Sequence, residues 1–408
     1  MKLDKALNID DLRTVARHRL PRMVFDALDG GADDERSLRA NRLAYDSITF
    51  RPRALVDVSE RDQSTTVFGE TISMPVMLSP TGSGRLACPG AELLLARESG
   101  KAGTIYAHGS VASYSAEDVA AASDGSLWYQ LYLPPDRLKA RKLIERVQAA
   151  GYRALVLTID TPVRGNRERD ARNQFSLPYT ISPHLIAQGM SRPAWSAQFL
   201  RANARLPRWG KSAGTPRKSS KPAQLSLREV ESSLIAARWP ATWEDVEFVR
   251  EVWQGPLLLK GIMRPDECDR IVSMGVDGIV VSNHGGRQLD GVPATIAVLP
   301  EIVDAVDKRA EVFVDGGIRR GTDVVKALAL GARACFVGRP YIYALAAGRG
   351  PGLVKMFEMF RTEIDRAMAL LGCQTIADID RSLVTHSCPT CSTTPASTTL
   401  SGAGSSER

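Results

Sequence analysis

Short apolar segments alternate with amphipathic segments along most of the chain. The apolar ones are rich in aliphatic residues, as buried parallel strands are, and they cover 74–80, 103–109, 127–132, 154–160, 256–261, 278–283, 311–316 and 334–339. The amphipathic ones between them, with apolar residues at helical spacing, include 91–102, 136–150, 265–274 and 321–330. Strands that alternate with helices predict parallel β/α units. Eight such units predict an α/β fold of the closed (β/α)8 or TIM barrel type.

Three segments do not follow this repeat. Residues 9–41 have helical spacing and are predicted to form an N-terminal cap on the barrel. Residues 175–240 form a long insertion after the fourth strand. The end of the chain, 387–408, is rich in Ser, Thr, Gly and Pro and is predicted to be a disordered tail. We therefore expect one barrel domain over 1–386.

The net charge of +7 is a local feature of the insertion. Residues 171–228 contain ten Lys or Arg and no Asp or Glu, so the rest of the chain has a net negative charge. This distribution argues against a general nucleic-acid-binding surface. Apolar residues make up 44% of the chain and charged residues 24%, which is ordinary for a globular protein with a sizeable core.

The first residues, MKLDKALNID, do not resemble a signal peptide. The chain also lacks a run of about 20 apolar residues, which a membrane-spanning helix needs. The six cysteines are scattered, and the CxxC of Cys388 and Cys391 lies in the predicted tail without a second ligand pair. A zinc or redox site is therefore disfavoured, and we expect a cytoplasmic protein with reduced cysteines.

Polar side chains follow the predicted strands at their C-terminal ends. TIM barrels place their catalytic groups at this end, whereas a purely structural barrel would not need chemically able side chains there. The residues concerned are Thr81, Gln130, Tyr132, Thr158, Asp160, Lys260, Ser282, Asn283, His284, Asp315 and Arg339. This pattern predicts an enzyme.

The segment IVVSNHGGRQLDG, 279–291, begins in the sixth predicted strand and continues into the loop directly after it. His284 could act as a general base, and Arg287 could bind a carboxylate in a bidentate manner. A single histidine is more often structural, but Ser282, Asn283 and Arg287 beside it favour a catalytic role. The glycine pair lets the backbone turn sharply between base and arginine.

The segment VFVDGGIRRGTDVVKALALGARACFVGR, 312–339, contains the loops after strands seven and eight. In TIM barrels these loops often bind phosphate through backbone N–H groups and a helix N-terminus. Arg319 and Arg339 would add charge-assisted hydrogen bonds. One Gly-Gly pair alone would suggest only a turn, but two such loops on consecutive strands favour a phosphate site. No GxGxxG motif follows a strand, which argues against a nicotinamide cofactor.

Two further charged residues end predicted strands. Asp160 could pair with a histidine and stabilise its imidazolium form, or it could be a turn or helix-cap residue. Lys260 ends the apolar run PLLLK. It would need an anion, such as the edge of a reduced flavin, unless it is a surface lysine beyond the strand.

These motifs resemble the FMN-dependent L-2-hydroxy-acid oxidase and dehydrogenase family, which includes glycolate oxidase, L-lactate dehydrogenase and (S)-mandelate dehydrogenase. SNHGGRQLDG and DGGIRRGTDVVKALALGA are its most specific motifs here, and the resemblance runs from about residue 9 to 380. RLPRMVFDALDGGADDE and RERD, 167–170, are most similar to the mandelate dehydrogenase branch. The resemblance implies an FMN enzyme that oxidises a 2-hydroxy acid to the 2-keto acid, and a tetrameric assembly.

The resemblance also implies a role for each matching residue. His284 would be the base, assisted by Asp160, while Arg287 and Arg167 would bind the substrate carboxylate and Tyr132 would hydrogen-bond the substrate. The residues implied to bind FMN are Pro80, Thr81 and Gly82 along the isoalloxazine, Gln130, Thr158, Lys260 and Ser282 on its polar atoms, and Asp315, Gly317, Arg319, Gly338 and Arg339 at the ribityl phosphate.

The chain departs from the family pattern at two positions. Ala27 stands where a substrate-binding tyrosine is usual, and the lost hydrogen bond to a charged group is worth roughly 1.5–3 kcal/mol. The pocket would then be wider, or the substrate different. Gly109 stands where a flavin-bonding serine is usual, and Ser110 or a backbone group would replace it. Gly82, where oxidases often have alanine, slightly favours a dehydrogenase that uses quinone or another acceptor.

The insertion 175–240 has two interpretations. Trp195, Phe199 and Leu200 are interleaved with arginines such as Arg201 and Arg205, which suits peripheral contact with an anionic membrane, on the inner face of the cell membrane, and electron delivery to quinone. The alternative is a lid over the active site.

Two alternatives to a simple 2-hydroxy-acid dehydrogenase remain open. One is an FMN oxidase acting on a larger biosynthetic substrate, motivated by Ala27. The other is a phosphate-binding barrel without catalysis.

Overall fold

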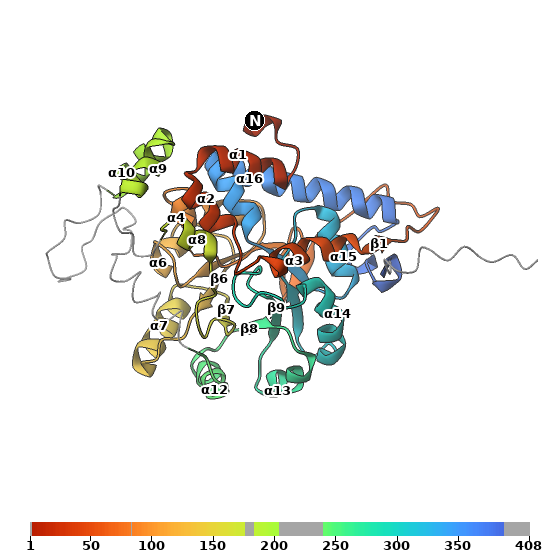
Figure 1. Ribbon diagram of the computed structural model, residues 1–408. Helices are drawn as coiled ribbons and strands as arrows, with labels where there is room; N and C mark the ends of the chain where they lie inside the picture. Colours follow the sequence, from red (N-terminus) through yellow and green to blue (C-terminus); the bar gives the residue numbers. More distant parts are fainter. Residues whose placement is uncertain (1, 83, 176–182, 204–239, 387–408) are drawn as a thin grey trace, which may run out of the picture.

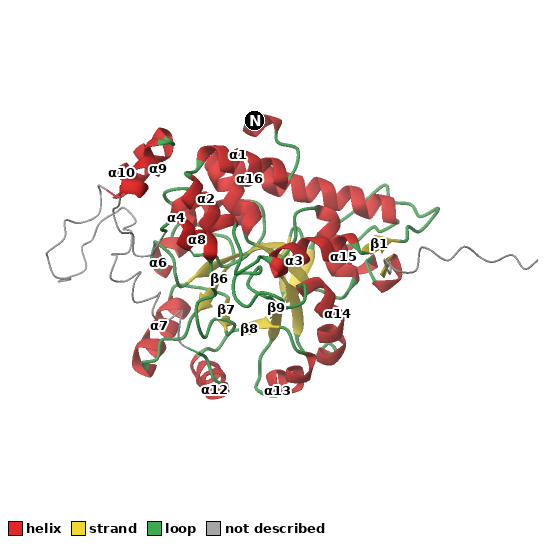
Figure 2. Cartoon of the chain, viewed as in Figure 1, coloured by secondary structure: helices red, strands yellow, loops and turns green. Residues whose placement is uncertain are grey.

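The computed structural model describes residues 2–82, 84–175, 183–203 and 240–386, and in these residues eight parallel strands close into a barrel (Figures 1 and 2). In chain order they are β4 (Val76–Leu78), β5 (Tyr106–Gly109), β6 (Leu127–Leu131), β7 (Ala154–Thr158), β8 (Leu257–Ile262), β9 (Gly278–Val281), β10 (Glu311–Val314) and β11 (Ala334–Val337). Strand β11 pairs with β4 and closes the ring. The prediction of a TIM barrel with eight strands at these places is confirmed, and most strands are shorter than expected.

Helices surround the barrel (Figure 2). They are α4 (Gly84–Ala87), α5 (Ala91–Lys101), α6 (Ala116–Ala120), α7 (Arg137–Ala149), α8 (Glu168–Arg172), α12 (Trp243–Val252), α13 (Cys268–Ser273), α14 (Thr295–Val306), α15 (Gly321–Ala329) and the long α16 (Arg339–Leu371). Helix α7 illustrates the local rules. The Asp136 side chain accepts hydrogen bonds from Leu138 N and Lys139 N and so caps its N-terminus. Ala140, Ile144 and Val147, spaced as one helix face, are its buried residues.

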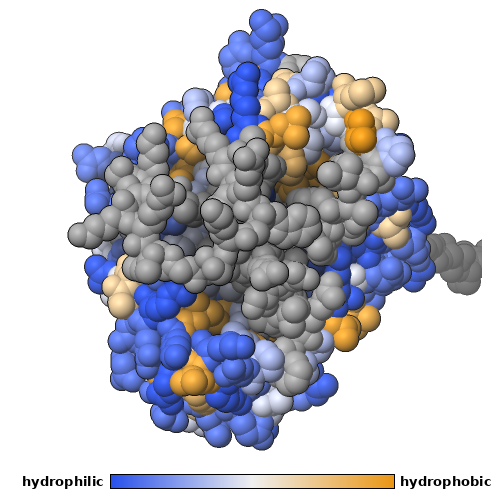
Figure 3. All heavy atoms as spheres, turned by 90° about the vertical axis from the view of Figure 1, so that its left-hand side faces the viewer, coloured by the Kyte–Doolittle hydropathy of each residue, from blue (hydrophilic) through white to orange (hydrophobic). Residues whose placement is uncertain are grey.

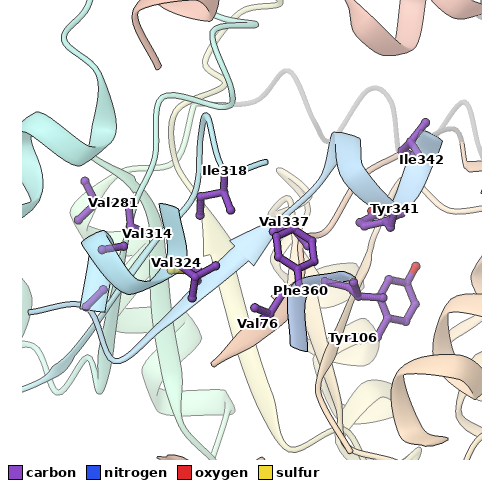
Figure 4. Close-up of a cluster of buried hydrophobic side chains, with 14 of the residues drawn as sticks. Val76, Tyr106, Val281, Val314, Ile318, Val324, Val337, Tyr341, Ile342 and Phe360 are labelled. Carbon is purple, nitrogen blue, oxygen red and sulfur yellow. The ribbon is translucent and has the colours of Figure 1, made fainter. Parts of the chain in front are cut away.

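The core has two layers, because successive strand residues point to opposite faces of the barrel wall. Inside the barrel, Trp128 and Phe313 are fully buried with their ring centroids 5.7 Å apart. Between the barrel and its helices lies a larger cluster, and Figure 4 shows part of it, including Val337 of β11 and Phe360 of α16.

A short hairpin closes the N-terminal end of the barrel. It consists of β2 (Thr65–Val67) and β3 (Glu70–Ile72), paired antiparallel. At its turn, the Phe68 ring lies 5.5 Å from Trp128 and 5.8 Å from Phe313, centroid to centroid. This hairpin was not among the elements predicted from the sequence. A second small sheet pairs β1 (Ile48–Phe50) with β12 (Val384–His386).

The N-terminal segment forms the predicted helical cap, as α1 (Ile9–Arg19), α2 (Arg22–Asp29) and α3 (Arg36–Asp46). Helix α1 lies along α16 (Figure 1). Helix α3 reaches the loop after β9, where the Asn41 and Asn283 amides exchange hydrogen bonds of 2.8 and 2.9 Å. The cap therefore lies over the C-terminal ends of the strands.

The insertion is described only in part, as α9 (Pro183–Met190) and α10 (Pro193–Asn203). The Trp195 indole stacks on Phe199 at 4.8 Å and donates a hydrogen bond of 2.8 Å to the Leu86 carbonyl, which fixes α10 against α4. The remainder of the insertion and the predicted tail with Cys388 and Cys391 lie outside the described residues. Among the described helices, none has the length and apolarity to cross a membrane.

Candidate active site

A cavity of about 250 Å³ opens at the C-terminal ends of the strands. Of the predicted site residues, those that line it are Pro80, Thr81, Gly82, Gln130, Tyr132, Arg167, Lys260, His284, Arg287, Asp315, Gly317, Arg319, Gly338 and Arg339. The other three stand behind this wall. Asp160 contacts His284, Ser282 contacts Lys260, and Thr158 is the ladder partner of Lys260. The fold thus brings together residues that are up to 259 positions apart in sequence, from Pro80 to Arg339.

His284 and Asp160 form a pair at the cavity wall. Nδ1 of His284 lies 3.0 Å from Oδ1 of Asp160, and His284 has a φ of +56°, in the left-handed region that a tight loop requires. Burial would raise the pKa of Asp160, but the neighbouring His284 outweighs burial and the pKa is lowered. The carboxylate therefore stays ionised, orients the imidazole and leaves Nε2 as the nitrogen available to a substrate.

Gln288 joins the two loops that carry this pair. Its Nε2 donates hydrogen bonds to the carbonyls of Asp160 and Val163, at 3.0 and 2.9 Å. Its Oε1 accepts a hydrogen bond of 3.2 Å from Gly165 N. One side chain therefore fixes the loop after β7 relative to the loop after β9. This role of Gln288 was not predicted, although the residue belongs to the motif 279–291.

Two half-buried arginines, Arg287 and Arg167, face the cavity without a carboxylate partner among the described residues. Arg287 donates only to backbone carbonyls, and Nε of Arg167 has no hydrogen-bond partner. Burial lowers the pKa of Arg167 to about 10. Burial likewise lowers the pKa of Arg287, and the neighbouring guanidiniums of Arg167 and Arg339 lower it further. An anion bound here would relieve this repulsion.

Arg164 is a cavity residue that the sequence analysis did not name. Its Nη2 lies 2.8 Å from Oδ2 of Asp170, a buried carboxylate that also lines the cavity. The departure at Ala27 lies in the same cavity, with Leu28, Leu86 and Val111. These apolar residues come from α2, α4 and the loop after β5, so no periodicity in the sequence marks them as neighbours.

Lys260 is buried inside β8 rather than exposed beyond it. Its Nζ lies 2.9 Å from Oδ2 of Asp315 and donates a hydrogen bond of 2.8 Å to Oγ of Ser282. The surface interpretation of Lys260 is therefore wrong, and Asp315 supplies the expected anion. Nε2 of Gln130, Oγ1 of Thr158 and Oδ1 of Asp315 are buried without partners among the described residues. Buried polar atoms are rarely left unpaired, so these atoms fit a polar ligand such as the edge of a flavin.

The loops after β10 and β11 suit a phosphate. Gly316 and Gly317 have φ values of +96° and +81°, and a Cβ on Gly317 would lie 1.8 Å from the Asn41 carbonyl, so only glycine fits. Arg319 follows this turn, and Arg339 begins α16. Backbone N–H groups at a helix N-terminus together with two arginines form an anion site. The residues present therefore fit FMN.

Ser110 does not line the cavity where the family's serine is missing at Gly109. Its Oγ accepts a hydrogen bond of 3.1 Å from Tyr132 N, and its own N–H donates to the Gln130 carbonyl at 3.0 Å. Ser110 thus supports two cavity residues through the backbone.

The comparisons with known proteins agree with this site. A model of the FMN-dependent dehydrogenase family matches residues 16–386. Glycolate oxidase 3 of Arabidopsis thaliana is 41% identical over 374 residues, which are 92% of this chain and 94% of the relative. Glycolate oxidase of Spinacia oleracea is 40% identical, with the same shares covered.

Two solved structures are also similar to this chain. The monotopic membrane protein (S)-mandelate dehydrogenase superposes with a TM-score of 0.84 at 35% identity, covering 94% of this chain and 100% of its own. A mandelate oxidase superposes with a TM-score of 0.76 at 37% identity, covering 93% and 98%. The chain therefore belongs to the FMN-dependent dehydrogenase family and is an oxidoreductase that acts on CH–OH donors with FMN as its cofactor.

Proposed function

We propose that the protein oxidises an L-2-hydroxy acid of lactate- or mandelate-like structure to the 2-keto acid, with His284 as the base. One observation carries the proposal. His284, which pairs with Asp160 at 3.0 Å, lines the same cavity as the half-buried guanidiniums of Arg287 and Arg167. This combination suits a substrate that has a carboxylate to be bound beside a proton to be removed.

The reaction releases two electrons and two protons from the substrate. FMN, when bound, would accept the two electrons together with one of the protons. Arg287 and Arg167 hold the carboxylate and so fix the carbon that bears the hydroxyl relative to His284. Nε2 of His284 takes one proton, and the ionised Asp160 stabilises the imidazolium that results. Burial raises the pKa of Tyr132, so its hydroxyl stays protonated and donates a hydrogen bond to the substrate.

The same proposal assigns the FMN-binding residues. Gln130, Thr158, Lys260 and Ser282 would bind the polar atoms of the isoalloxazine, and Pro80, Thr81 and Gly82 would lie along it. Arg319, Arg339 and the N–H groups of Gly317 and Gly338 would hold the phosphate. The Asp315 carboxylate cannot donate a hydrogen bond to a phosphate, so its unpartnered Oδ1 suits a ribityl hydroxyl or an N–H group.

The cavity favours a substrate with a sizeable apolar side chain. Ala27 leaves the space that a tyrosine would fill, and Leu28, Leu86 and Val111 line it. A mandelate-like acid suits this lining better than glycolate. The same space supports the second candidate function, an oxidase for a larger biosynthetic molecule that carries a 2-hydroxy acid group.

The electron acceptor would be quinone or another carrier rather than oxygen, with peripheral contact at a membrane. The described part of the insertion exposes Ile186, Met190 and Leu200 at 55, 73 and 65%. On the face shown in Figure 3, apolar side chains form separate patches among hydrophilic ones. The similar (S)-mandelate dehydrogenase is a monotopic membrane protein, which supports this assignment.

An anaerobic titration of the purified, FMN-loaded protein tests the proposal. Glycolate, lactate, mandelate and longer L-2-hydroxy acids are added in turn while the flavin absorbance is followed. We expect mandelate or a similarly bulky acid to bleach the flavin, and a quinone analogue to restore the colour faster than air does. A flavin that none of the acids bleaches would reject the proposed substrate class.

A further inference from the structure

The end of α2 offers three backbone carbonyls to two arginines of the cavity. Arg287 donates from Nη1 to Gly30 O at 2.8 Å and from Nη2 to Ala27 O at 3.0 Å. Arg339 donates from Nε to Asp29 O at 3.0 Å and from Nη2 to Gly30 O at 2.9 Å. The Gly30 carbonyl therefore accepts hydrogen bonds from both guanidiniums and sets their relative position.

These hydrogen bonds orient both guanidiniums and still leave donors for anions. A guanidinium has five N–H donors. Arg287 uses two of them on α2, and Arg339 uses two on α2 and one on Gly285 O at 3.0 Å. At least two donors remain on each arginine, which is enough for a bidentate hydrogen bond to a carboxylate or a phosphate. The carbonyls at a helix C-terminus are its negative end, which offsets part of the cost of burying two cations there.

The Asp29 side chain fixes this end of α2. Its carboxylate accepts hydrogen bonds from Nε and Nη2 of Arg13 at 2.6 and 2.8 Å, from the Tyr343 hydroxyl at 2.7 Å and from Arg169 at 3.1 Å. The residue is 5% exposed. These partners lie on α1, α16 and α8. One carboxylate therefore ties the helix end to three other helices.

We propose that Asp29 is a positioning residue that fixes the last turn of α2, so that its carbonyls hold Arg287 and Arg339 as one unit. This inference rests on the proposed function for the assignment of Arg287 to the substrate carboxylate and of Arg339 to the FMN phosphate. A disturbance of the helix end weakens substrate binding and FMN binding together. Replacing either arginine weakens only the site that it serves.

The test measures two constants on each variant. One is the FMN dissociation constant of the apoprotein, from flavin fluorescence, and the other is KM of the FMN-saturated enzyme. Asp29→Asn keeps the shape of the side chain and removes its charge. We expect both constants to rise about tenfold, as for a misplaced hydrogen bond to a charged group, with kcat changed less than KM. Arg287→Lys should raise KM alone, and Arg339→Lys the FMN dissociation constant alone.

Asp365→Asn is the matched control. Asp365 also accepts a bidentate pair of hydrogen bonds from an arginine, Arg61, at 2.9 and 2.9 Å, and neither residue lines the cavity. This variant should leave both constants at their wild-type values, even where it lowers the melting temperature.

Gly30→Ala provides a second variant that changes no charge. A Cβ at this position would lie 2.7 Å from the Asp26 carbonyl, so the turn must shift. We expect KM and the FMN dissociation constant to rise together in this variant as well. It tests the inference where Asp29→Asn does not fold. A folded variant of either kind that changes neither constant, or only one, overturns the inference. A wild-type enzyme that no 2-hydroxy acid reduces would reject the proposed function instead, while the FMN measurement would still test Asp29.

Discussion

The N-terminal end of the barrel is closed by apolar packing, with Phe68 of the hairpin against Trp128 and Phe313, whereas the C-terminal end opens into a cavity with buried charges. At the open end, Arg287 donates to backbone carbonyls and not to a carboxylate, and Oδ1 of Asp315 has no hydrogen-bond partner among the described residues. The two ends of the same eight-stranded barrel therefore differ in character, one being apolar and closed and the other polar and open. The closed end contributes stability, while the open end keeps polar groups unpaired for a ligand, at a cost to stability.

Arg287→Met should have the largest effect on function and little effect on stability. Removing one member of a buried charge pair costs about 2–5 kcal/mol, so kcat/KM should fall by roughly 30- to 5,000-fold. The melting temperature should stay or rise, because a half-buried guanidinium without a carboxylate partner contributes little to stability. Steady-state kinetics and a thermal melt measure the two effects. A kcat/KM like that of the wild type would show that Arg287 does not bind the substrate.

Phe68→Ala should have the opposite profile. Truncating this packed aromatic ring should cost roughly 3 kcal/mol of unfolding free energy. KM and the FMN dissociation constant should not change, because the hairpin lies at the far end of the barrel. Leu55→Ala is the surface control, since Leu55 is fully exposed. Denaturant unfolding and steady-state kinetics measure the two effects. A Phe68→Ala variant with a raised KM and an unchanged unfolding free energy would contradict the separation of the two ends.

Ala27→Tyr should shift the substrate preference from mandelate to smaller 2-hydroxy acids. The added hydroxyl would contribute about 1.5–3 kcal/mol to binding a small acid such as glycolate or lactate, while the ring would exclude mandelate. Ala27→Phe is the matched control, because it fills the same space without the hydroxyl. We expect Ala27→Phe to exclude mandelate without improving the binding of glycolate. Equal glycolate kinetics in the Tyr and Phe variants would mean that the hydroxyl makes no contact with the substrate.

The smallest effect concerns pH and the N-terminal cap. Burial would raise the pKa of Asp29, but hydrogen bonds from Arg13 and Tyr343 hold it well below the ordinary value of 3.8. A lowered pKa in the folded state stabilises the protein above pH 3.8, and this stability is lost as the pH falls further. Unfolding free energies of the wild type and Asp29→Asn should therefore differ by a constant amount from pH 7 to 5 and converge below 3.8. A difference that shrinks at neutral pH would contradict this.

The barrel and much of the site could be predicted because their signals are local. Each strand is a short aliphatic run, and the polar residue after it marks the open end, as with Gln130 and Lys260. The pairing of His284 with Asp160 followed from complementary chemistry at two strand ends. Lys260 was expected to need an anion, and the Asp315 carboxylate lies beside it. That Lys260 also binds the flavin stays a prediction.

The parts that sequence analysis missed depend on contacts between distant segments. The hairpin strands have three residues each, too few for a clear alternation. The support of Arg287 comes from backbone carbonyls of α2, and any residue type provides a carbonyl. Arg164 could have been found, because it stands three residues before Arg167 in the same loop.

The most direct test of the central claim is a rapid-mixing measurement of flavin reduction without oxygen, for the wild type and His284→Ala side by side. General-base catalysis contributes about 10²–10⁴-fold, so reduction by the best 2-hydroxy acid should slow by that factor. The variant should keep its FMN and its melting temperature. Reduction of His284→Ala at the wild-type rate would contradict the assignment of the base, and with it the account of the cavity as a site for 2-hydroxy-acid oxidation.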